Sequence, residues 1–343
     1  MSFIASILSR AAAARRRIVF PESTDRRTLD AIVSLRAGRV VEPVVVLDPA
    51  HPSSHDDARA LDVETVDPLT DARRPRVVDA IVGGRGKRII SPAEAETLAL
   101  TPLYFADALV AFGDADGCVA GAIHTTADVL RAALRLIGPA TGVTTVSSAF
   151  YMVTPPFRND AEEVLTFADC AVVVAPTPAQ LADIAIAAAA DRRRIVGDEP
   201  RVAFLSYSTL GSGAGPSVDA VREAVALTRS RAPGLRVDGE LQGDAALIAA
   251  VADRKAAGSD VAGQANVLVF PSLDAGNIAY KLVQRLARAS AIGPIVQGLD
   301  RPCSDLSRGA VTDDIIHVAA VTALQVSSPH LTKRFKPPRE NQS

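Results

Sequence analysis

The chain has 343 residues, of which 48% are hydrophobic and 22% are charged, and its net charge at pH 7 is −2. A globular chain of this length ordinarily forms two domains, and its charge argues against a dedicated nucleic-acid binder. The N-terminal apolar run is too short and interrupted for a signal peptide, and no run reaches the ~18 residues of a membrane span. We therefore expect a cytoplasmic protein that binds neither nucleic acid nor membranes.

Strands and helices alternate along the chain. The sequence predicts strands at residues 17–20, 40–47, 109–113, 170–175, 202–206 and 266–270, and helical patterns follow several of them. This alternation predicts an α/β fold with mostly parallel sheets, in which ligands bind near the carboxyl ends of the strands. The charged, proline-bearing tail after Leu331 is expected to fray.

Residues 207–217 carry several glycines after a predicted strand and invite comparison with a dinucleotide-binding loop. The comparison fails because Pro216 directly follows the last glycine, and because no acidic residue stands at the expected distance of about 20 residues. We therefore interpret this segment as a flexible connection between a strand and a helix.

The three cysteines, Cys118, Cys170 and Cys303, show no metal-ligand spacing and lie among small or apolar residues. This setting is typical of buried thiols in a reducing compartment. A nucleophilic role for Cys303 would require a basic partner, and no histidine lies near it in the sequence. The sequence therefore predicts buried thiols and no bound metal.

The segment 301–316 places Ser307, Arg308 and Asp314 within eight positions, ahead of an apolar helical run. A proline and a glycine favour a loop here, and Thr312 is a good N-cap, so Asp314 should lie in the first helical turn. A loop that enters a helix N-terminus presents free N–H groups and suits an anionic ligand. An ordinary turn capped by two acidic residues fits these residues equally well.

Residues 121–131 form a second candidate segment, in which Thr125 and Thr126 precede a helix. Hydroxyl groups at a helix N-terminus, with Arg131 one turn inside, would form a small anion site. The helical spacing places Arg131 and Arg135 together, away from the apolar face, so a solvated helix surface is the alternative. A third helix, through Ile278, Leu282 and Leu286, carries Lys281, Arg285 and Arg288 along one side, with the same alternative.

Taken together, these segments resemble the phosphate acetyltransferase (phosphotransacetylase) family, within the phosphate acetyl/butyryl transferase group. The similar blocks occur in order along almost the whole chain, at residues 17–22, 121–128, 167–170 with 181–185, 206–213, 238–242, 266–271, 275–285 and 305–309. The resemblance implies reversible transfer of an acetyl group between acetyl phosphate and coenzyme A, without a covalent enzyme intermediate. Coenzyme A or acetyl-CoA is then a substrate, and no permanently bound cofactor is expected.

The resemblance also implies two α/β/α domains, like those of isocitrate and isopropylmalate dehydrogenases, with the active site in the cleft between them. Domain 1 would comprise residues 1–145 and 299–343, and domain 2 residues 146–298. A homodimer is usual in the family and is expected here.

Individual roles follow from the same resemblance. Asp314 matches the proposed base that takes the thiol proton of coenzyme A, and Arg308 and Ser307 match the pair that holds the anionic substrate and the developing oxyanion. The remaining matches are substrate-binding candidates, namely Arg131, Thr125, Thr126, Arg285, Tyr280 and Lys281. Either Arg85 or Arg88 could supply a further substrate arginine, and the sequence leaves that choice open.

Two points of chemistry remain open at this stage. An ordinary aspartate has a pKa of about 3.9 and an alkyl thiol about 8.5, so full proton transfer to Asp314 is uphill by roughly 6 kcal/mol. Burial could raise the pKa of Asp314, the proton could move only as the sulfur attacks, or nearby arginines could acidify the thiol. One alternative function is butyryl or propionyl transfer. Another, of a different class, is a decarboxylating dehydrogenase of the same fold, but this sequence shows no clustered carboxylates that would bind the divalent metal of such an enzyme.

Overall fold

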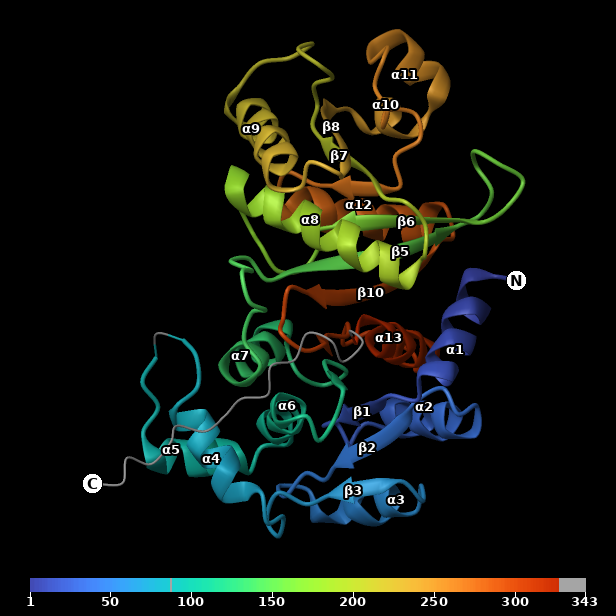
Figure 1. The fold of residues 1–343 in the computed structure, drawn as a ribbon. Helices are drawn as coiled ribbons and strands as arrows, with labels where there is room; N and C mark the ends of the chain where they lie inside the picture. Colours follow the sequence, from blue (N-terminus) through green and yellow to red (C-terminus); the bar gives the residue numbers. More distant parts are fainter. Residues whose placement is uncertain (87, 327–343) are drawn as a thin grey trace.

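The computed structural model describes residues 1–86 and 88–326 and contains two β-sheets stacked along its long axis (Figure 1). The first sheet has the strand order β11-β4-β1-β2-β3, and the second has the order β10-β5-β6-β9-β7-β8. Residues 327–343 lie outside the described residues, and they include the end of the predicted domain 1 and the tail after Leu331 that was predicted to fray.

All strands of the first sheet are parallel, and helices cover both of its faces. Its strands are β1 (Arg17–Phe20), β2 (Glu42–Val46), β3 (Glu64–Val66), β4 (Gly117–Val119) and β11 (Cys303–Ser304). One face packs against α1 (Phe3–Ala14), α2 (Arg26–Ala37) and α13 (Thr312–Gln325). The other packs against α4 (Arg74–Val82), α5 (Pro92–Ala99), α6 (Pro102–Phe112) and α7 (Thr126–Leu136). The short elements η1 (Pro52–Ser54) and α3 (His55–Arg59) lie between β2 and β3.

The second sheet is mixed. It contains β5 (Ser147–Thr154), β6 (Glu163–Ala168), β7 (Arg201–Leu205), β8 (Arg236–Leu241), β9 (Val267–Val269) and β10 (Ser290–Gln297). The pairs β10–β5 and β5–β6 are antiparallel and the other pairs are parallel. One face packs against α8 (Pro178–Ile195) and α9 (Pro216–Arg231), the other against α10 (Gly243–Leu247), α11 (Ala249–Lys255) and α12 (Leu273–Leu286). The predicted α/β class with mostly parallel sheets is confirmed.

Burial on both faces explains why the strands are almost wholly apolar. In β1, Ile18 and Phe20 point into the core beneath α2 and α13, whereas Val19 points into the core beneath α6. Successive side chains of a strand point to opposite faces, so a strand that is covered twice needs apolar residues at every position.

Two strand predictions were wrong. Residues 109–112 belong to α6, whose residues are apolar on nearly all sides because the helix is buried, and a short apolar run does not separate a buried helix from a strand. Residues 170–175 form no strand, because β6 ends at Ala168 and the Asp169 carboxylate accepts N–H bonds from Ala171, Val172 and Val173. These bonds turn the chain at the end of β6.

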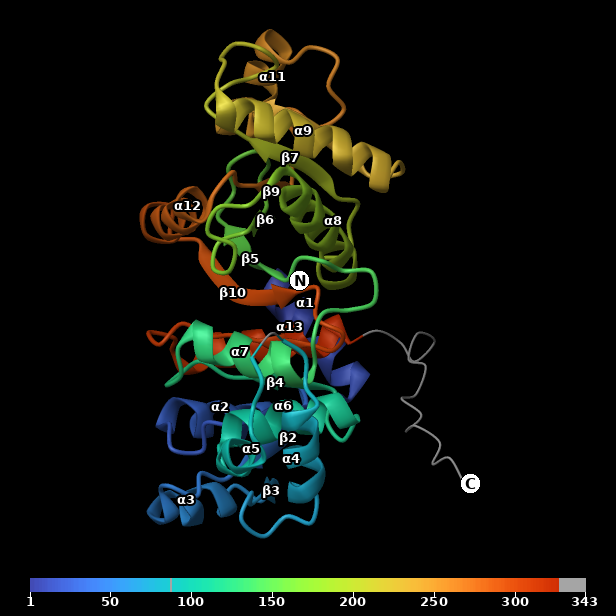
Figure 2. The ribbon, with the colours of Figure 1, turned by 90° about the vertical axis from the view of Figure 1, so that its left-hand side faces the viewer.

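Helix α13 lies between the two sheets, as both views show (Figures 1 and 2). Its buried side chains belong to the same core as Tyr151 and Ile295 of the second sheet. Near its C-terminus, Gln325 Nε2 donates to Asp191 Oδ2 of α8 at 2.9 Å and to the Val296 carbonyl of β10 at 3.0 Å. The last helix of the chain therefore packs against both halves of the molecule.

Among the described residues, no single helix is both long and apolar enough to cross a membrane. Helices α5 and α6 are long and apolar enough only when taken together, and they are bent by 93° at the break between them.

Candidate active site

The predicted residues of the first half of the molecule follow two neighbouring parallel strands. Strands β4 and β11 pair in register, Cys118 with Cys303, and the segments 121–126 and 305–311 leave their carboxyl ends together. The two segments touch directly. Gly121 has φ +113°, and a Cβ at this position would stand 2.4 Å from Asp305 Oδ1, so only glycine permits the approach.

Thr126 and Asp305 fix the two segments to each other. Thr126 Oγ1 donates to Asp305 Oδ2 at 2.6 Å, and Asp305 is buried. Burial raises the pKa of the Asp305 carboxyl to about 6. The predicted substrate residue Thr126 therefore uses its hydroxyl to hold the segment that carries Ser307 and Arg308.

Glu22 organises the segment after β4, and sequence reasoning gave it no role. Its carboxylate accepts backbone N–H bonds from Gly121, Ala122, Ile123 and His124 at 2.8–3.2 Å, and His124 Nδ1 lies 2.8 Å from Oε1. Burial alone would raise the pKa of the Glu22 carboxyl, but the bonds from His124 and the backbone outweigh it and hold the pKa below its ordinary value. The bond to Glu22 raises the pKa of His124.

Arg27 joins both segments to helix α2. Its guanidinium donates to the carbonyls of Arg308 and Ala310 at 2.9 and 2.8 Å, and to that of Ala122 at 2.9 Å. The Asp25 carboxylate pairs with the same guanidinium at 2.7 Å. The position of Glu22 and Arg27 in the sequence could have identified them. Both closely follow the carboxyl end of a predicted parallel strand, where ligand sites form.

Ser307 and Arg308 lie on an exposed loop, as predicted. Ser307 Oγ accepts from Gly309 N at 3.3 Å, and the Ser307 carbonyl accepts from Ala310 N at 2.8 Å. The Arg308 backbone is held by Arg27, whereas its guanidinium makes no hydrogen bond or ion pair with any described residue. A positioned backbone with an unpaired guanidinium suits the binding of an anion.

Asp314 lies in the first turn of α13, also as predicted, but the helix begins at Thr312 with Val311 as its N-cap. Thr312 is therefore not the N-cap that the sequence suggested. Asp314 is half-buried, and its Oδ2 accepts from Val311 N at 3.0 Å. The carboxylate acts as a cap, and its other oxygen makes no hydrogen bond within the described part of the chain.

Thr125 and Arg131 are linked through Asp128. Thr125 caps α7 and its Oγ1 donates to Asp128 Oδ2 at 2.7 Å, while Arg131 donates to Asp128 Oδ1 at 2.6 Å. Arg131 remains exposed. Arg135 does not share this surface, because it is buried and donates to carbonyl groups at the end of α4 and in the segment after it, those of Ile81, Val82, Arg85 and Arg88.

The predicted residues of the second half lie on α12. The buried Tyr280 ring stacks on Phe150 with centroids 4.0 Å apart, and Lys281 Nζ lies 4.9 Å from the Tyr280 ring centre. Arg285 is exposed in the last turn. In Figure 2, α12 lies on the same side of the molecule as the segment leading into α13. No hydrogen bond or ion pair between described residues joins α12 to residues 121–131 or 305–314.

The two remaining arginine candidates make local contacts. Arg85 Nη1 donates to the Pro139 carbonyl at 2.9 Å, and Arg88 pairs with Glu94 at 2.6 Å.

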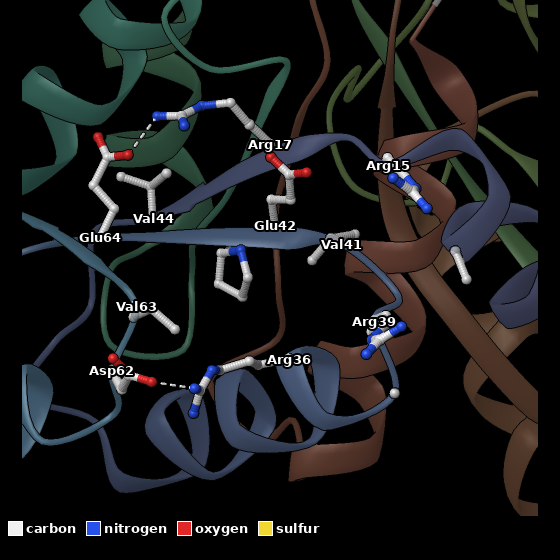
Figure 3. Close-up of a pocket in the computed structure, with 13 residues that line it drawn as sticks. Arg15, Arg17, Arg36, Arg39, Val41, Glu42, Val44, Asp62, Val63 and Glu64 are labelled. Atoms are coloured by element: carbon white, nitrogen blue, oxygen red, sulfur yellow. Dashed lines mark hydrogen bonds and ion pairs between the residues drawn. The ribbon is translucent and has the colours of Figure 1, made fainter.

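A separate pocket of about 750 Å³ lies at the opposite, amino ends of β1, β2 and β3 (Figure 3). Its arginines include Arg17, paired with Glu64 at 2.8 Å, and Arg36, paired with Asp62. None of the predicted site residues lines this pocket, and parallel sheets bind ligands at the other end of their strands. We therefore do not assign it to the active site.

The sequence profile of the phosphate acetyl/butaryl transferase family matches residues 2–323. The chain belongs to this family. Phosphate acetyltransferases from Thermoanaerobacterium thermosaccharolyticum and Acetivibrio thermocellus are 44% and 43% identical to it, over 95% of this chain and 99% and 98% of theirs. A solved phosphotransacetylase from Streptococcus pyogenes superposes with a TM-score of 0.87 at 38% identity, covering 95% of this chain and 99% of that one. One from Staphylococcus aureus gives 0.83 at 36%, covering 95% and 98%.

The Glu22–His124 pair predicts a pH dependence of stability. Because the pKa of Glu22 is lowered, its contribution to the free energy of unfolding is present above pH 4.5 and is lost as the pH falls below that value. Because the pKa of His124 is raised, its contribution to the free energy of unfolding is present below pH 6.5 and is lost as the pH rises above that value. Glu22→Gln should lower the free energy of unfolding by at least about 3 kcal/mol, since several charge-assisted bonds are lost. The difference from wild type should be largest between pH 4.5 and 6.5 in urea unfolding.

His51→Gln, at the exposed pair with Asp48, is the matched control and should change stability by less than about 1 kcal/mol. A Glu22→Gln protein as stable as wild type throughout this pH range would contradict the assignment of Glu22 as the anchor of residues 121–124.

Proposed function

We propose that this chain is a phosphate acetyltransferase, which transfers an acetyl group reversibly between acetyl phosphate and coenzyme A. The observation that carries the proposal is the exposed loop at Ser307 and Arg308, where a fixed backbone presents an unpaired guanidinium beside the first turn of α13. Full-length similarity to curated phosphate acetyltransferases supports the same reaction.

In the forward reaction, the coenzyme A sulfur attacks the carbonyl carbon of acetyl phosphate in a ternary complex. A C–S bond forms, the bond between the acyl carbon and the phosphate oxygen breaks, and inorganic phosphate leaves with its electron pair. Arg308 and Ser307 would bind the phosphoryl group and the oxyanion that develops on the carbonyl oxygen. Arg131 and the N–H groups at the N-terminus of α7 would supply further donors to the anion, and Thr125 would contribute as the N-cap that begins this helix.

Asp314 would accept the thiol proton. The bond from Val311 N holds one oxygen of the carboxylate, and the other oxygen makes no hydrogen bond with any described residue, so it is available to receive the proton. We infer that the proton moves to Asp314 as the sulfur attacks, which avoids the roughly 6 kcal/mol cost of a separate transfer. Alternatively, the arginines acidify the thiol and Asp314 orients it.

We also propose that residues 1–145 with 299–343 and residues 146–298 form two domains, with the active site between them. The division is supported by the sheets, since each draws all of its strands from one of these sets. Arg285 and Lys281 of α12, with Tyr280 beneath them, would then approach the Ser307 loop and the phosphates of coenzyme A from the other domain.

We also propose that the substrate carries a short acyl group and that the reaction needs no permanently bound cofactor. Acetyl transfer is the first choice, and comparison of turnover on acetyl, propionyl and butyryl phosphates would separate it from transfer of longer acyl groups. A cytoplasmic location is supported by three buried free cysteines, which are typical of a reducing compartment.

A homodimer through α12 completes the proposal. Ile278, Leu282 and Leu286 recur at every fourth position and are 57%, 52% and 81% exposed, so they form an apolar stripe on the surface. Such a stripe on an otherwise well-packed molecule is typical of a protein interface. A second copy is the occupant that the family resemblance favours, and a two-fold axis would pair the stripe with itself.

Replacing Asp314 tests the proposed chemistry. Asp314→Asn retains an oxygen that can accept from Val311 N, so the fold should be preserved while kcat falls by roughly 10²- to 10⁴-fold with little change in KM. The assay follows thioester formation from acetyl phosphate and coenzyme A. Asp313→Asn, at the exposed neighbouring position, is the control and should keep full activity. Unchanged kcat with a lower melting temperature in Asp314→Asn would reduce Asp314 to a helix cap.

Replacing Leu282 tests the dimer. Leu282→Asp should give a monomer in sedimentation velocity at concentrations at which the wild type is dimeric, because it introduces a charge into the proposed apolar interface. Val33→Asp places the same charge on α2 at a site that is 50% exposed, and should leave the dimer intact. A monomeric wild type, or a variant that stays dimeric, would rule out this interface.

A further inference from the structure

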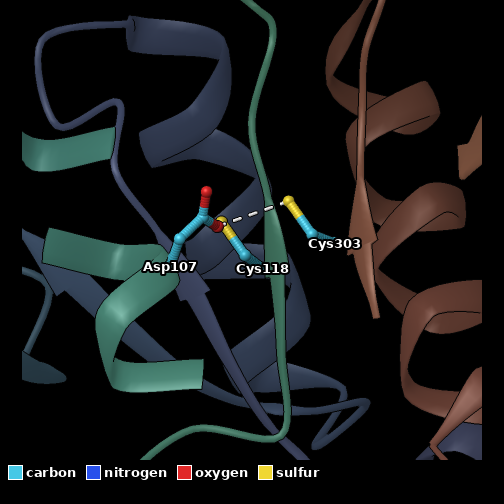
Figure 4. Close-up of side chains that lie close together, drawn as sticks. All are labelled: Asp107, Cys118 and Cys303. Atoms are coloured by element: carbon cyan, nitrogen blue, oxygen red, sulfur yellow. Dashed lines mark hydrogen bonds between the residues drawn. The ribbon is translucent and has the colours of Figure 1, made fainter. Parts of the chain in front are cut away.

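Three potential metal ligands, two of them close in sequence and the third distant, meet in the first half of the molecule. Cys118 of β4 and Cys303 of β11 pair in register on parallel strands, so their side chains point to the same face of the sheet. Asp107 of α6 packs on that face, and Cys303 Sγ donates to Asp107 Oδ1 at 3.4 Å (Figure 4). One ligand atom from each residue lies within 4.8 Å of the other two.

These three side chains are fully buried among apolar residues. Asp107 Oδ2 is also buried, and it has no hydrogen-bond partner among the described residues. An unsatisfied buried polar atom costs about 1–3 kcal/mol, more if it is charged, so a carboxyl group at this position needs a reason. The two nearby thiols are weak hydrogen-bond donors, so they do not compensate for the burial of the carboxyl group.

We propose that Asp107, Cys118 and Cys303 form a structural site for a zinc ion. Zinc binds thiolate sulfur at about 2.3 Å and carboxylate oxygen at about 2.0–2.2 Å in tetrahedral geometry, which places the ligand atoms about 3.5–3.8 Å apart. The distance of 3.4 Å between Cys303 Sγ and Asp107 Oδ1 is close to this value. Three of the four positions are then filled by one atom from each residue, and the Asp107 Oδ2 atom, which has no partner among the described residues, can bind beside Oδ1 as a fourth donor in a distorted rather than regular tetrahedron.

A disulfide between the two cysteines fits less well. Neighbouring parallel strands lie about 4.8 Å apart, and side chains in register begin at nearly that separation. A disulfide prefers about 3.8 Å between its Cβ atoms and gives Asp107 no partner. Two sulfur–zinc bonds span the larger separation between the two cysteines without moving the strands, and the Asp107 carboxylate then serves as a ligand.

The ion would fix the start of the active-site segment. Strand β11 consists of only two residues, and Asp305, Ser307 and Arg308 follow it directly. Coordination by Cys303 would hold β11 to β4 and to α6, which are separated from it by almost two hundred residues of chain. Because the site is fully buried, it would be loaded as the protein folds, and binding would displace the protons of its ligands.

The test measures metal in the intact protein. The chain is produced with zinc in the medium and purified without chelators, and zinc is determined by plasma mass spectrometry. We expect about one zinc per chain in wild type and in Cys170→Ala, which removes the buried cysteine of the other half. Zinc should fall at least tenfold in the Cys118→Ala/Cys303→Ala variant and in the milder Asp107→Asn variant. Protein produced with cobalt should show thiolate-to-cobalt charge-transfer absorption.

The wild-type protein alone can overturn the proposal, whether or not the variants fold. If the protein contains no zinc and all three cysteines react as free thiols after unfolding, then Asp107, Cys118 and Cys303 are an ordinary part of the core. Absence of zinc with Cys170 as the single reactive thiol would establish a disulfide instead. Zinc that persists in the double cysteine variant would lie elsewhere on the protein. Each of these results contradicts the site.

Discussion

The buried carboxylate of Glu22 is the interaction on which the candidate site depends. It receives four consecutive backbone N–H groups and the His124 ring, and so fixes the turn between β4 and α7. Arg27 then ties that turn to the carbonyl groups of the loop after β11. Thr126 adds a third connection, to Asp305. These contacts hold the backbone at Arg308 and leave its side chain exposed, as the proposed anion binding requires.

The Asp314 carboxylate caps α13 and is also the base in the proposed reaction. A capping acid at the third position of a helix is common, and the bond from Val311 N accounts for its presence without catalysis. The same bond orients the carboxylate, and its second oxygen makes no hydrogen bond with any residue that the structure describes. In the proposed reaction, a carboxylate held in this way would receive the proton as the sulfur attacks.

The sequence predicted the α/β alternation, the loop at Ser307 and the helix that contains Asp314, because these follow from periodicity and from local turn and capping residues. It did not predict what depends on distant contacts. Residues 170–175 look like a buried strand, but Asp169 turns them away from the sheet. Ile278, Leu282 and Leu286 have the spacing of a core face and are exposed. Cys118 and Cys303 show no metal spacing in the sequence, and only strand pairing brings them together.

The central claim is that the Arg308 guanidinium binds the phosphoryl group and stabilises the transition state. Steady-state turnover of acetyl phosphate with coenzyme A by Arg308→Ala, compared with wild type, tests it most directly. The account predicts that kcat/KM falls by at least about a hundredfold, as for the loss of an oxyanion donor. Urea unfolding should stay unchanged, because the exposed side chain makes no hydrogen bond or ion pair with any described residue. Wild-type kinetics in this variant, or no turnover of any short acyl phosphate by the wild-type protein, would contradict it.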